Sequence, residues 1–195
     1  WDTEPHPIAE VLAAGIPQPQ PIEMKRTQDE ALGVLVHLDE RNQKWSEAKA
    51  ITQKALMTAQ SINARELTYQ WQWQLGRILK AQGNKLEAIA AYTQATENLQ
   101  SLRSDLVAIG SKVQYSFRDK IEPVYRELSV LLLQPEASQA ELNLTRQIIE
   151  SLQVAELDNF FRDACLDTKP QLIDQLDPTA AVIYTIVIDN RLEVV

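Results

Sequence analysis

The stretch QLGRILKAQGNKLEAIAAYTQA, residues 74–95, decides the fold, because it predicts two helices separated by one short break. Apolar residues recur at helical spacing on both sides of Gly83, and a glycine there can adopt the left-handed backbone that ends a helix. Small residues stand at fixed places around the break, at Gly76, Ala88 and Ala95. Where antiparallel helices cross closely, small side chains occupy the contact points and larger ones fill the spaces between them. The stretch therefore predicts a closely packed helical hairpin.

The same helical periodicity continues in both directions along the chain. Three capping patterns, in which a Thr, Asn or Ser precedes a glutamate by three residues, predict helix starts at Thr27, Asn63 and Ser138. Pro123 either kinks the helix that contains it or marks the first turn of that helix. The expected helices begin with one that starts at Thr27 and continue with 45–61, 63–83, 85–109, 116–133, 138–153 and 155–167.

Composition divides the chain into four segments. Residues 1–26 are rich in proline and predict an extended leader or linker. Residues 27–167 predict a helical repeat domain, and residues 168–178 predict a second linker. Residues 179–195 contain two β-branched runs around a polar pair at Asp189, which predicts a β-hairpin. The expected fold class is therefore mainly α: an antiparallel stack of helical hairpins with about seven helices and a short C-terminal β-hairpin.

Charge and hydropathy argue against several classes of partner. The chain has 195 residues and a formal net charge of −8 at pH 7, which disfavours a nucleic-acid surface and a polybasic membrane anchor. No apolar run reaches the roughly 18 residues of a membrane-spanning helix. No signal peptide is visible, so the cytoplasm is the expected compartment. Because the chain begins at Trp1 and stops within a strand pattern, we interpret it as an excised piece of a longer protein, and an exported form stays open.

The residues around the break match the tetratricopeptide (TPR) pattern, in which small, apolar and aromatic residues recur at fixed offsets. The matching residues are Leu75, Gly76, Gly83, Ala88, Tyr92 and Ala95. Residues 69–102 thus resemble one tetratricopeptide repeat. Three positions depart from the pattern: Gln72 and Leu79 stand where aromatic residues are usual, and Gln100 where proline is usual. The resemblance implies a superhelical stack of helix pairs with a concave binding face.

A weaker copy of this repeat precedes it, because WSEAKAITQKAL aligns with KLEAIAAYTQAT at an offset of 40 residues. Its small residues are Ala48, which aligns with Ala88, and Ala55, which aligns with Ala95. Val36 and Gln43 stand where the pattern expects glycines. A third helix pair, residues 116–153, matches in length and polarity but lacks the small residues. Three pairs satisfy the number that a continuous repeat core requires.

The order of segments from residue 45 to residue 195 resembles that of bacterial TPR–CHAT proteins, in which tetratricopeptide repeats precede a caspase-like peptidase module called CHAT. The run from Tyr69 to Leu106 is fairly specific, and the combined order of the segments is more so. The hairpin predicted at 179–195 resembles the start of the CHAT module. It implies that the repeats bind a partner or substrate protein and regulate or feed the peptidase. The catalytic His and Cys of that family lie further along the CHAT module, and nothing in this chain aligns with them. The resemblance therefore implies no catalytic set within this chain.

Trp73, Arg77 and Lys80 are the candidate residues for binding a protein or peptide partner. Their spacing of four and three residues places them on one face of a helix, and the TPR resemblance assigns that face to the concave groove. An aromatic ring beside two cations suits a peptide with a carboxylate and an apolar anchor. In the first repeat His37 and Glu40 take the places of Arg77 and Lys80, and Arg41 follows Glu40. The alternative is that Trp73 packs against a neighbouring repeat and that the cations are solvated.

Two other sets of side chains bear on this groove. Trp71 lies two residues before Trp73 and about 200° around the helix, so one of the two is expected in the core and the other outside it. Arg118, Lys120 and Arg126 could extend a basic strip along the helix predicted at 116–133.

The sequence gives no reason to expect a cofactor or a metal ion. Cys165 is the single cysteine, and His6 and His37 are the two histidines, so a buried packing thiol is expected rather than a nucleophile. His37 has no second ligand nearby for a metal. No glycine-rich phosphate-binding motif is present. The second functional hypothesis is a structural scaffold that forms homodimers through the repeats or through an exposed hairpin edge.

Overall fold

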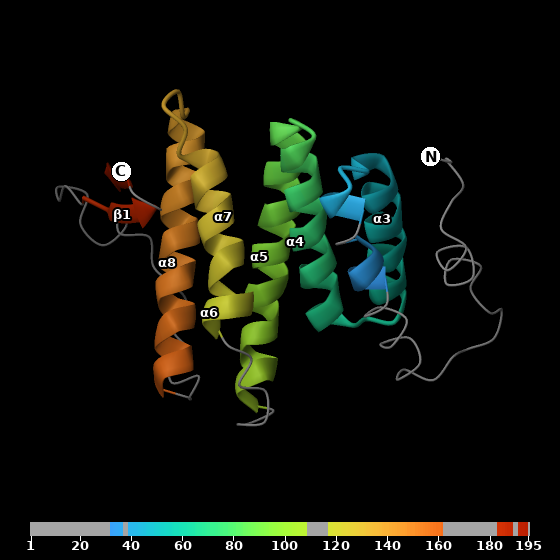
Figure 1. The fold of residues 1–195 in the computed structure, drawn as a ribbon. Coiled ribbons are helices and arrows are strands. Elements are labelled where there is room, and N and C mark those ends of the chain that lie inside the picture. Colours follow the sequence, from blue (N-terminus) through green and yellow to red (C-terminus); the bar gives the residue numbers. More distant parts are fainter. Residues whose placement is uncertain (1–31, 37–38, 109–116, 162–182, 189–190, 195) are drawn as a thin grey trace. The chain divides into compact units, whose positions relative to one another are not determined.

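The computed structural model describes residues 32–36, 39–108, 117–161, 183–188 and 191–194. This part of the chain is mainly helical and ends in a two-stranded antiparallel hairpin, which confirms the predicted fold class (Figure 1). Short helical segments at 32–36 and 39–41 precede the labelled elements. The labelled elements are α3 (Trp45–Ser61), α4 (Arg65–Ala81), α5 (Lys85–Ala108), α6 (Phe117–Lys120), α7 (Glu122–Leu132), α8 (Gln139–Phe161), β1 (Thr185–Ile188) and β2 (Arg191–Val194).

The chain divides into two compact units, unit 1 (Trp1–Ala91) and unit 2 (Tyr92–Val195), so that the boundary falls within α5. Unit 1 contains α3, α4 and the start of α5. Unit 2 contains the rest of α5, the helices α6 to α8 and the hairpin. Each unit is described separately below.

Three helix ends in unit 1 repeat the same backbone turn at intervals of 20 residues. Gln43, Asn63 and Gly83 have positive φ values of 58°, 52° and 78°. In each turn the following amide donates to a carbonyl five residues earlier: Lys44 to Asp39 at 2.8 Å, Ala64 to Ala59 at 3.0 Å, and Asn84 to Leu79 at 2.9 Å. This is the Schellman arrangement, which satisfies the last carbonyls of a helix. Two such intervals make 40 residues, the offset at which the two repeat copies align.

Adding a glycine to the first of these turns and removing the glycine from the third are expected to change the free energy of unfolding in opposite directions. Gln43→Gly is expected to raise the free energy of unfolding by about 1 kcal/mol, because glycine adopts positive φ without the steric cost of a side chain. Gly83→Ala is expected to lower it by about 1 kcal/mol through backbone strain, since no atom lies within 4 Å of the Cβ that would be added. Urea unfolding of both variants measures the two changes. Changes of the same sign would contradict the equivalence of the turns.

The helix caps confirm one prediction and correct another. Ser138 and Glu141 form the predicted capping box: the Ser138 amide donates to the Glu141 carboxylate at 2.8 Å, and the Glu141 amide donates to the Ser138 hydroxyl at 3.3 Å. The predicted cap at Asn63 is wrong, because the residue before α4 is Ala64 and no side chain caps it. Asn63 instead takes the left-handed position that ends α3, a conformation that asparagine tolerates. The predicted cap at Thr27 lies outside the described residues.

The core of unit 1 forms where α3 and the segment 32–36 meet α4. Its buried cluster contains small residues of α3 and large residues of α4, and its members are Leu32, Val36, Ala48, Ala55, Ala59, Trp71 and Ile78. Ala48 and Ala55 are fully buried, and so is Ala88 in α5. Gly76 is also buried, whereas Leu75 is half-buried. Four of the small residues that the repeat pattern predicts at helix contacts, Ala48, Ala55, Gly76 and Ala88, are therefore buried.

In unit 2 the helices differ from prediction at two places. The helix expected at 116–133 is two helices, α6 and α7, and Pro123 lies in the first turn of α7. The break expected between the helices at 138–153 and 155–167 is absent, because α8 runs from Gln139 to Phe161 and the residues around Gln153 include no glycine or proline that would break a helix. Residues 162–167 lie outside the described residues. In the third helix pair, α7 has 11 residues and α8 has 23, against 17 in α4 and 24 in α5, so only the first helix of the pair differs markedly in length.

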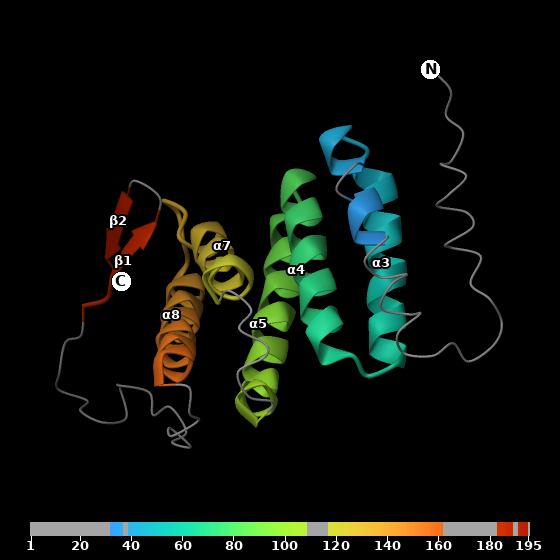
Figure 2. The same cartoon turned by 60° about the horizontal axis from the view of Figure 1, so that its bottom comes forward.

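The hairpin packs against the helices of unit 2 (Figure 2). Ile188 pairs with Arg191, so the connection has two residues, as predicted. Ile186 is buried in a small cluster whose other members are Leu133, Val130, Leu142 and Ile149. Polar contacts join the same elements, because the Tyr184 hydroxyl bonds to the Glu150 carboxylate. The hairpin is therefore held to α7 and α8 by one apolar anchor and by side-chain hydrogen bonds.

Candidate functional site

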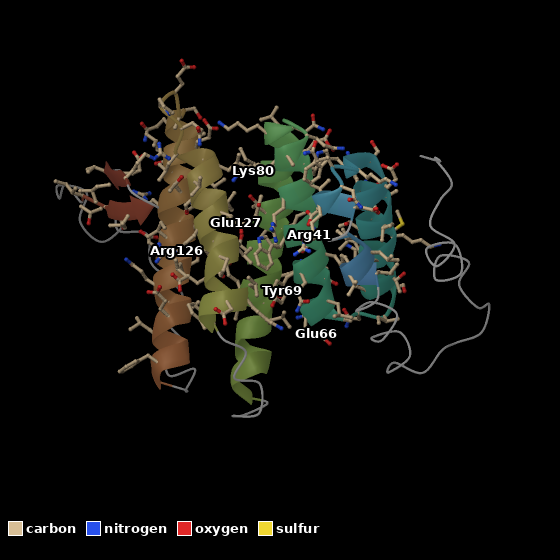
Figure 3. All side chains as sticks on the ribbon, in the orientation of Figure 1. Arg41, Glu66, Tyr69, Lys80, Arg126 and Glu127 are labelled. Carbon is tan, nitrogen blue, oxygen red and sulfur yellow. The ribbon has the colours of Figure 1, made fainter. Side chains whose placement is uncertain are left out.

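One face of α4 carries the predicted binding residues, and the opposite face lies in the core. Trp71 and Ile78 are buried in the unit 1 cluster. Positions three and four residues apart form the other face, which carries Glu66, Trp73, Arg77 and Lys80. Tyr69 lies at the edge of this face and is buried, with 6% of its surface exposed. Figure 3 shows Glu66 and Tyr69 toward the N-terminal end of α4 and Lys80 toward its C-terminal end. The face therefore changes from an acidic and aromatic end to a basic end.

Trp73 and Arg77 are in direct contact, as their spacing predicts. The guanidinium carbon of Arg77 lies 5.6 Å from the centre of the Trp73 ring, within the range of a cation–π interaction. Trp73 is half-buried and Arg77 is exposed. Of the two neighbouring tryptophans, Trp71 is the core residue, with 5% of its surface exposed. The stacking holds the guanidinium over the indole and leaves its N–H donors available at the surface.

Lys80 and Arg41 add two exposed cations to the same part of unit 1. Lys80 is in the last turn of α4. Figure 3 shows Arg41 at a height along α4 between Tyr69 and Lys80. His37, the remaining predicted groove residue, lies outside the described residues. The structure thus places three of the predicted cations, Arg41, Arg77 and Lys80, in one unit and on two neighbouring helical segments.

A hydrogen bond that the sequence did not predict joins these two segments. The Gln74 amide donates to the Glu40 carboxylate at 2.7 Å, and Gln74 is 9% exposed. Glu40 immediately precedes Arg41, so this bond fixes the backbone that carries Arg41 against α4. The sequence contains one sign of this bond, because Gln74 is a polar residue between apolar Trp73 and Leu75 in a predicted helix. Its partner lies 34 residues away, and no local pattern identifies that partner.

The cations considered for a basic strip on 116–133 lie on two helices. Lys120 belongs to α6 and Arg126 belongs to α7, and nothing is described for the side chain of Arg118. Arg126 pairs with Glu122 one turn earlier and donates to the Val187 carbonyl at 3.3 Å. Arg126 therefore connects α7 to the hairpin.

Of the two buried repeat positions in unit 2, Tyr92 and Ala95, Tyr92 has a polar role. Tyr92 is fully buried, and its hydroxyl donates to the Glu127 carboxylate at 2.7 Å. Ala95, one turn further along α5, is also fully buried. The hydrogen bond joins α5 to α7 within unit 2 and satisfies a hydroxyl that burial would otherwise leave without water.

The residues considered for catalysis or metal binding are mostly outside the described part of the chain, including Cys165 and His6. Among the described residues, no group of three or more His, Cys, Asp or Glu side chains could hold a metal ion. Within the same residues, no helix has both the length and the apolar character needed to cross a membrane.

Comparisons of the chain with protein-family models, with curated proteins and with solved structures found no match. The fold itself defines a helical protein of repeat-like architecture with a C-terminal hairpin. The candidate site is therefore argued from its own geometry.

Proposed function

We propose that this chain is a non-catalytic protein-interaction module of the tetratricopeptide type, and that it binds a partner or substrate polypeptide. We further propose that it regulates or feeds a CHAT caspase-like peptidase in the same gene product. The repeat-like helix pairs and their 20-residue turn interval support the first proposal. The second rests on the resemblance of the segment order alone.

The observation that carries the interaction proposal is the chemistry of the exposed face of α4. A half-buried indole, a guanidinium stacked on it and a lysine one turn further on lie together on a chain whose net charge is −8. A guanidinium that is stacked on an aromatic ring can still bind a carboxylate through two parallel N–H donors. The exposed part of the indole offers a surface for an apolar side chain. The ligand class that fits is an extended peptide with a carboxylate next to an apolar residue.

Charge reversal at Arg77 tests this assignment. We expect Arg77→Glu to weaken the binding of such peptides at least about tenfold, because an attractive contact with the carboxylate becomes repulsive. The measurement is fluorescence polarisation with a library of labelled peptides that end in an apolar residue and a free carboxylate. The same peptides with an amidated C-terminus show whether the carboxylate is recognised.

Lys54→Glu is the matched control, because Lys54 is an exposed lysine on α3 and carries the same charge change. It is expected to leave peptide binding unchanged. Trp73→Ala is the second test variant and should also weaken binding, with the helical circular dichroism retained. Unchanged binding in both Arg77→Glu and Trp73→Ala would show that this face is not the binding site.

The peptidase part of the proposal is tested on the full gene product, with and without residues 1–178. Higher activity after their removal would identify the repeats as a restraint. Loss of cleavage of a specific protein, with cleavage of a small peptide retained, would identify them as a substrate receptor. If neither form has peptidase activity, the proposed link to a CHAT peptidase is wrong and the interaction proposal is left to the peptide-binding test.

A scaffold function is the second candidate, and one observation favours it. Val187, Leu192 and Val194 are apolar side chains that the hairpin leaves exposed. Exposed apolar patches on a sheet commonly mark contact with another polypeptide.

A further inference from the structure

The two faces of the hairpin differ in their surroundings. Ile186 faces the helices of unit 2 and is 4% exposed. Since side chains alternate along a strand, its cross-strand partner Glu193 lies on the same face, and so does Arg191. Arg191 and Glu193 form an ion pair at 3.4 Å along β2. The outer face carries the exposed Val187 and Leu192, which lie opposite each other.

The outer edge of β1 is already used by the protein itself. Arg126 of α7 donates to the Val187 carbonyl at 3.3 Å, and Glu122 holds Arg126 in place through an ion pair. An arginine at this position obstructs a further strand at β1. The structure thus protects one edge of the hairpin by a side chain, a common way to prevent edge pairing.

The same hydrogen bond shows which backbone groups point outward from β2. Because the Val187 carbonyl points toward α7, the pair formed by Val187 and Leu192 is a pair without mutual backbone hydrogen bonds. The length of the connection leads to the same assignment. In a hairpin with a two-residue connection, the pair next to the connection, here Ile188 and Arg191, is a hydrogen-bonded pair, so the following pair of Val187 and Leu192 is not. The N–H and C=O groups of Leu192 therefore point to the outer edge of β2.

That edge of β2 is open within the described part of the chain. The sheet has two strands, and β2 pairs with β1 alone among the described residues. Figure 2 shows that β1 lies nearer to α8 than β2 does, so the outer edge of β2 is directed away from that helix. A strand can approach this edge without displacing the helices of unit 2.

We propose that β2 pairs antiparallel with β2 of a second copy of the chain, around a two-fold axis that passes through Leu192. The outward N–H and C=O groups of the two Leu192 residues then bond to each other. Arg191 of one copy lies opposite Glu193 of the other, and the symmetry generates this attractive pair twice. The strand sequence is therefore complementary to itself in this register.

Charge selects this register from its neighbours. The N–H and C=O groups of every second residue of β2 point outward, and these groups must face one another in the two copies. The two strands can therefore shift past each other only by two residues, which moves the two-fold axis by one residue. An axis at Glu193 places Glu193 opposite Glu193 of the second copy, and an axis at Arg191 places the two Arg191 residues opposite each other. Like charges directly opposite are unfavourable in a sheet. The axis at Leu192 is the one that places opposite charges together.

The apolar outer face is consistent with this pairing. The two Leu192 side chains come to lie against each other, with Val187 of each copy on the neighbouring strands, so that contact between the copies covers part of the exposed apolar surface. This inference does not depend on the proposed peptide binding, because it concerns the hairpin in unit 2 rather than the face of α4.

A charge-swap series tests the proposal on the full 195-residue chain. Arg191→Glu alone and Glu193→Arg alone each place like charges opposite one another, and each is expected to lower the dimerisation constant about tenfold or more. The double variant Arg191→Glu with Glu193→Arg restores opposite charges in the same register and is expected to restore dimerisation. Sedimentation velocity over a concentration series measures the constants, and circular dichroism checks that helix content is unchanged.

Three results would overturn the proposal. The first is a wild-type chain that remains monomeric up to about 200 µM, a concentration at which even a weak dimer is populated. The second is a dimer that forms equally in the wild type and in both single variants, which would place the contact elsewhere. Failure of the double variant to recover, while both single variants are weakened, would also contradict the register.

Discussion

Replacing Trp71 with alanine is expected to lower the free energy of unfolding by about 3–5 kcal/mol, the largest effect that we expect of a single substitution in unit 1. Trp71 is 5% exposed and lies in the cluster that joins α4 to α3 and to the segment 32–36. Its removal leaves a cavity that small neighbours such as Ala55 and Ala59 cannot fill. Urea unfolding followed by circular dichroism measures the change.

Trp73→Ala is the matched control, because it removes the same side chain two residues along the same helix. We expect a smaller loss, about 1–2 kcal/mol, from the partly buried ring and its contact with Arg77. Equal losses in the two variants, or a larger loss at Trp73, would show that the core of unit 1 is assigned to the wrong face of α4. The same pair separates stability from binding, since Trp73 is the residue proposed to contact a peptide.

The helices of unit 1 could be predicted from the sequence, because the apolar periodicity that forms them and the residues that end them are local features of the chain. Trp45–Ser61 was predicted with the bounds that the structure gives for α3. The left-handed residue at Gly83 was equally evident, since glycine accepts this backbone at little cost. Gln43 was read as a departure from the repeat pattern, although its backbone repeats the turn at Gly83. The Schellman bonds impose this conformation on a residue that does not favour it, and side-chain identity alone could not show it.

Errors in the predicted fold occurred where two local signals competed for one residue, or where no residue enforced an expected break. Asn63 has the chemistry of a helix cap, but it also tolerates the left-handed backbone that the preceding helix end requires, and the helix end prevailed. In α8 the break expected after Gln153 had no glycine or proline to enforce it. Helix propagation is cooperative, so an uninterrupted segment continues as one helix.

In the candidate site and at the hairpin, contacts between residues close in sequence could be predicted, and contacts between distant residues could not. The contact between Trp73 and Arg77 was predictable, because residues four apart on a helix are neighbours. The bond from Gln74 to Glu40 and the bond from Arg126 to the Val187 carbonyl were not, since they join residues 34 and 61 positions apart. Arg126 has the appearance of a groove cation in the sequence and serves as an edge cap in the fold.

Replacing Ile186 with alanine is expected to release the hairpin from unit 2 while the helices remain folded. A two-stranded hairpin is only marginally stable in water, and Ile186 is the residue of β1 that is buried with Leu133. Replacing a buried isoleucine with alanine costs about 2–5 kcal/mol. Here this loss lowers the free energy needed to open the hairpin locally. Hydrogen exchange at the hydrogen-bonded amides of β1 and β2 should therefore accelerate by about 30-fold or more, with exchange in α7 and α8 little changed.

Val187→Ala is the control for this prediction, because Val187 is the next residue of β1 but points outward and is 64% exposed. Its truncation is expected to change hairpin exchange by less than about threefold when the protein is dilute. If Ile186→Ala also leaves exchange unchanged, the hairpin is held by its polar contacts, among them those of Arg126 and Tyr184. If instead Ile186→Ala accelerates exchange in α8 as strongly as in β1, the hairpin and the helices open together, and the hairpin is part of the core of unit 2 rather than an appendage to it.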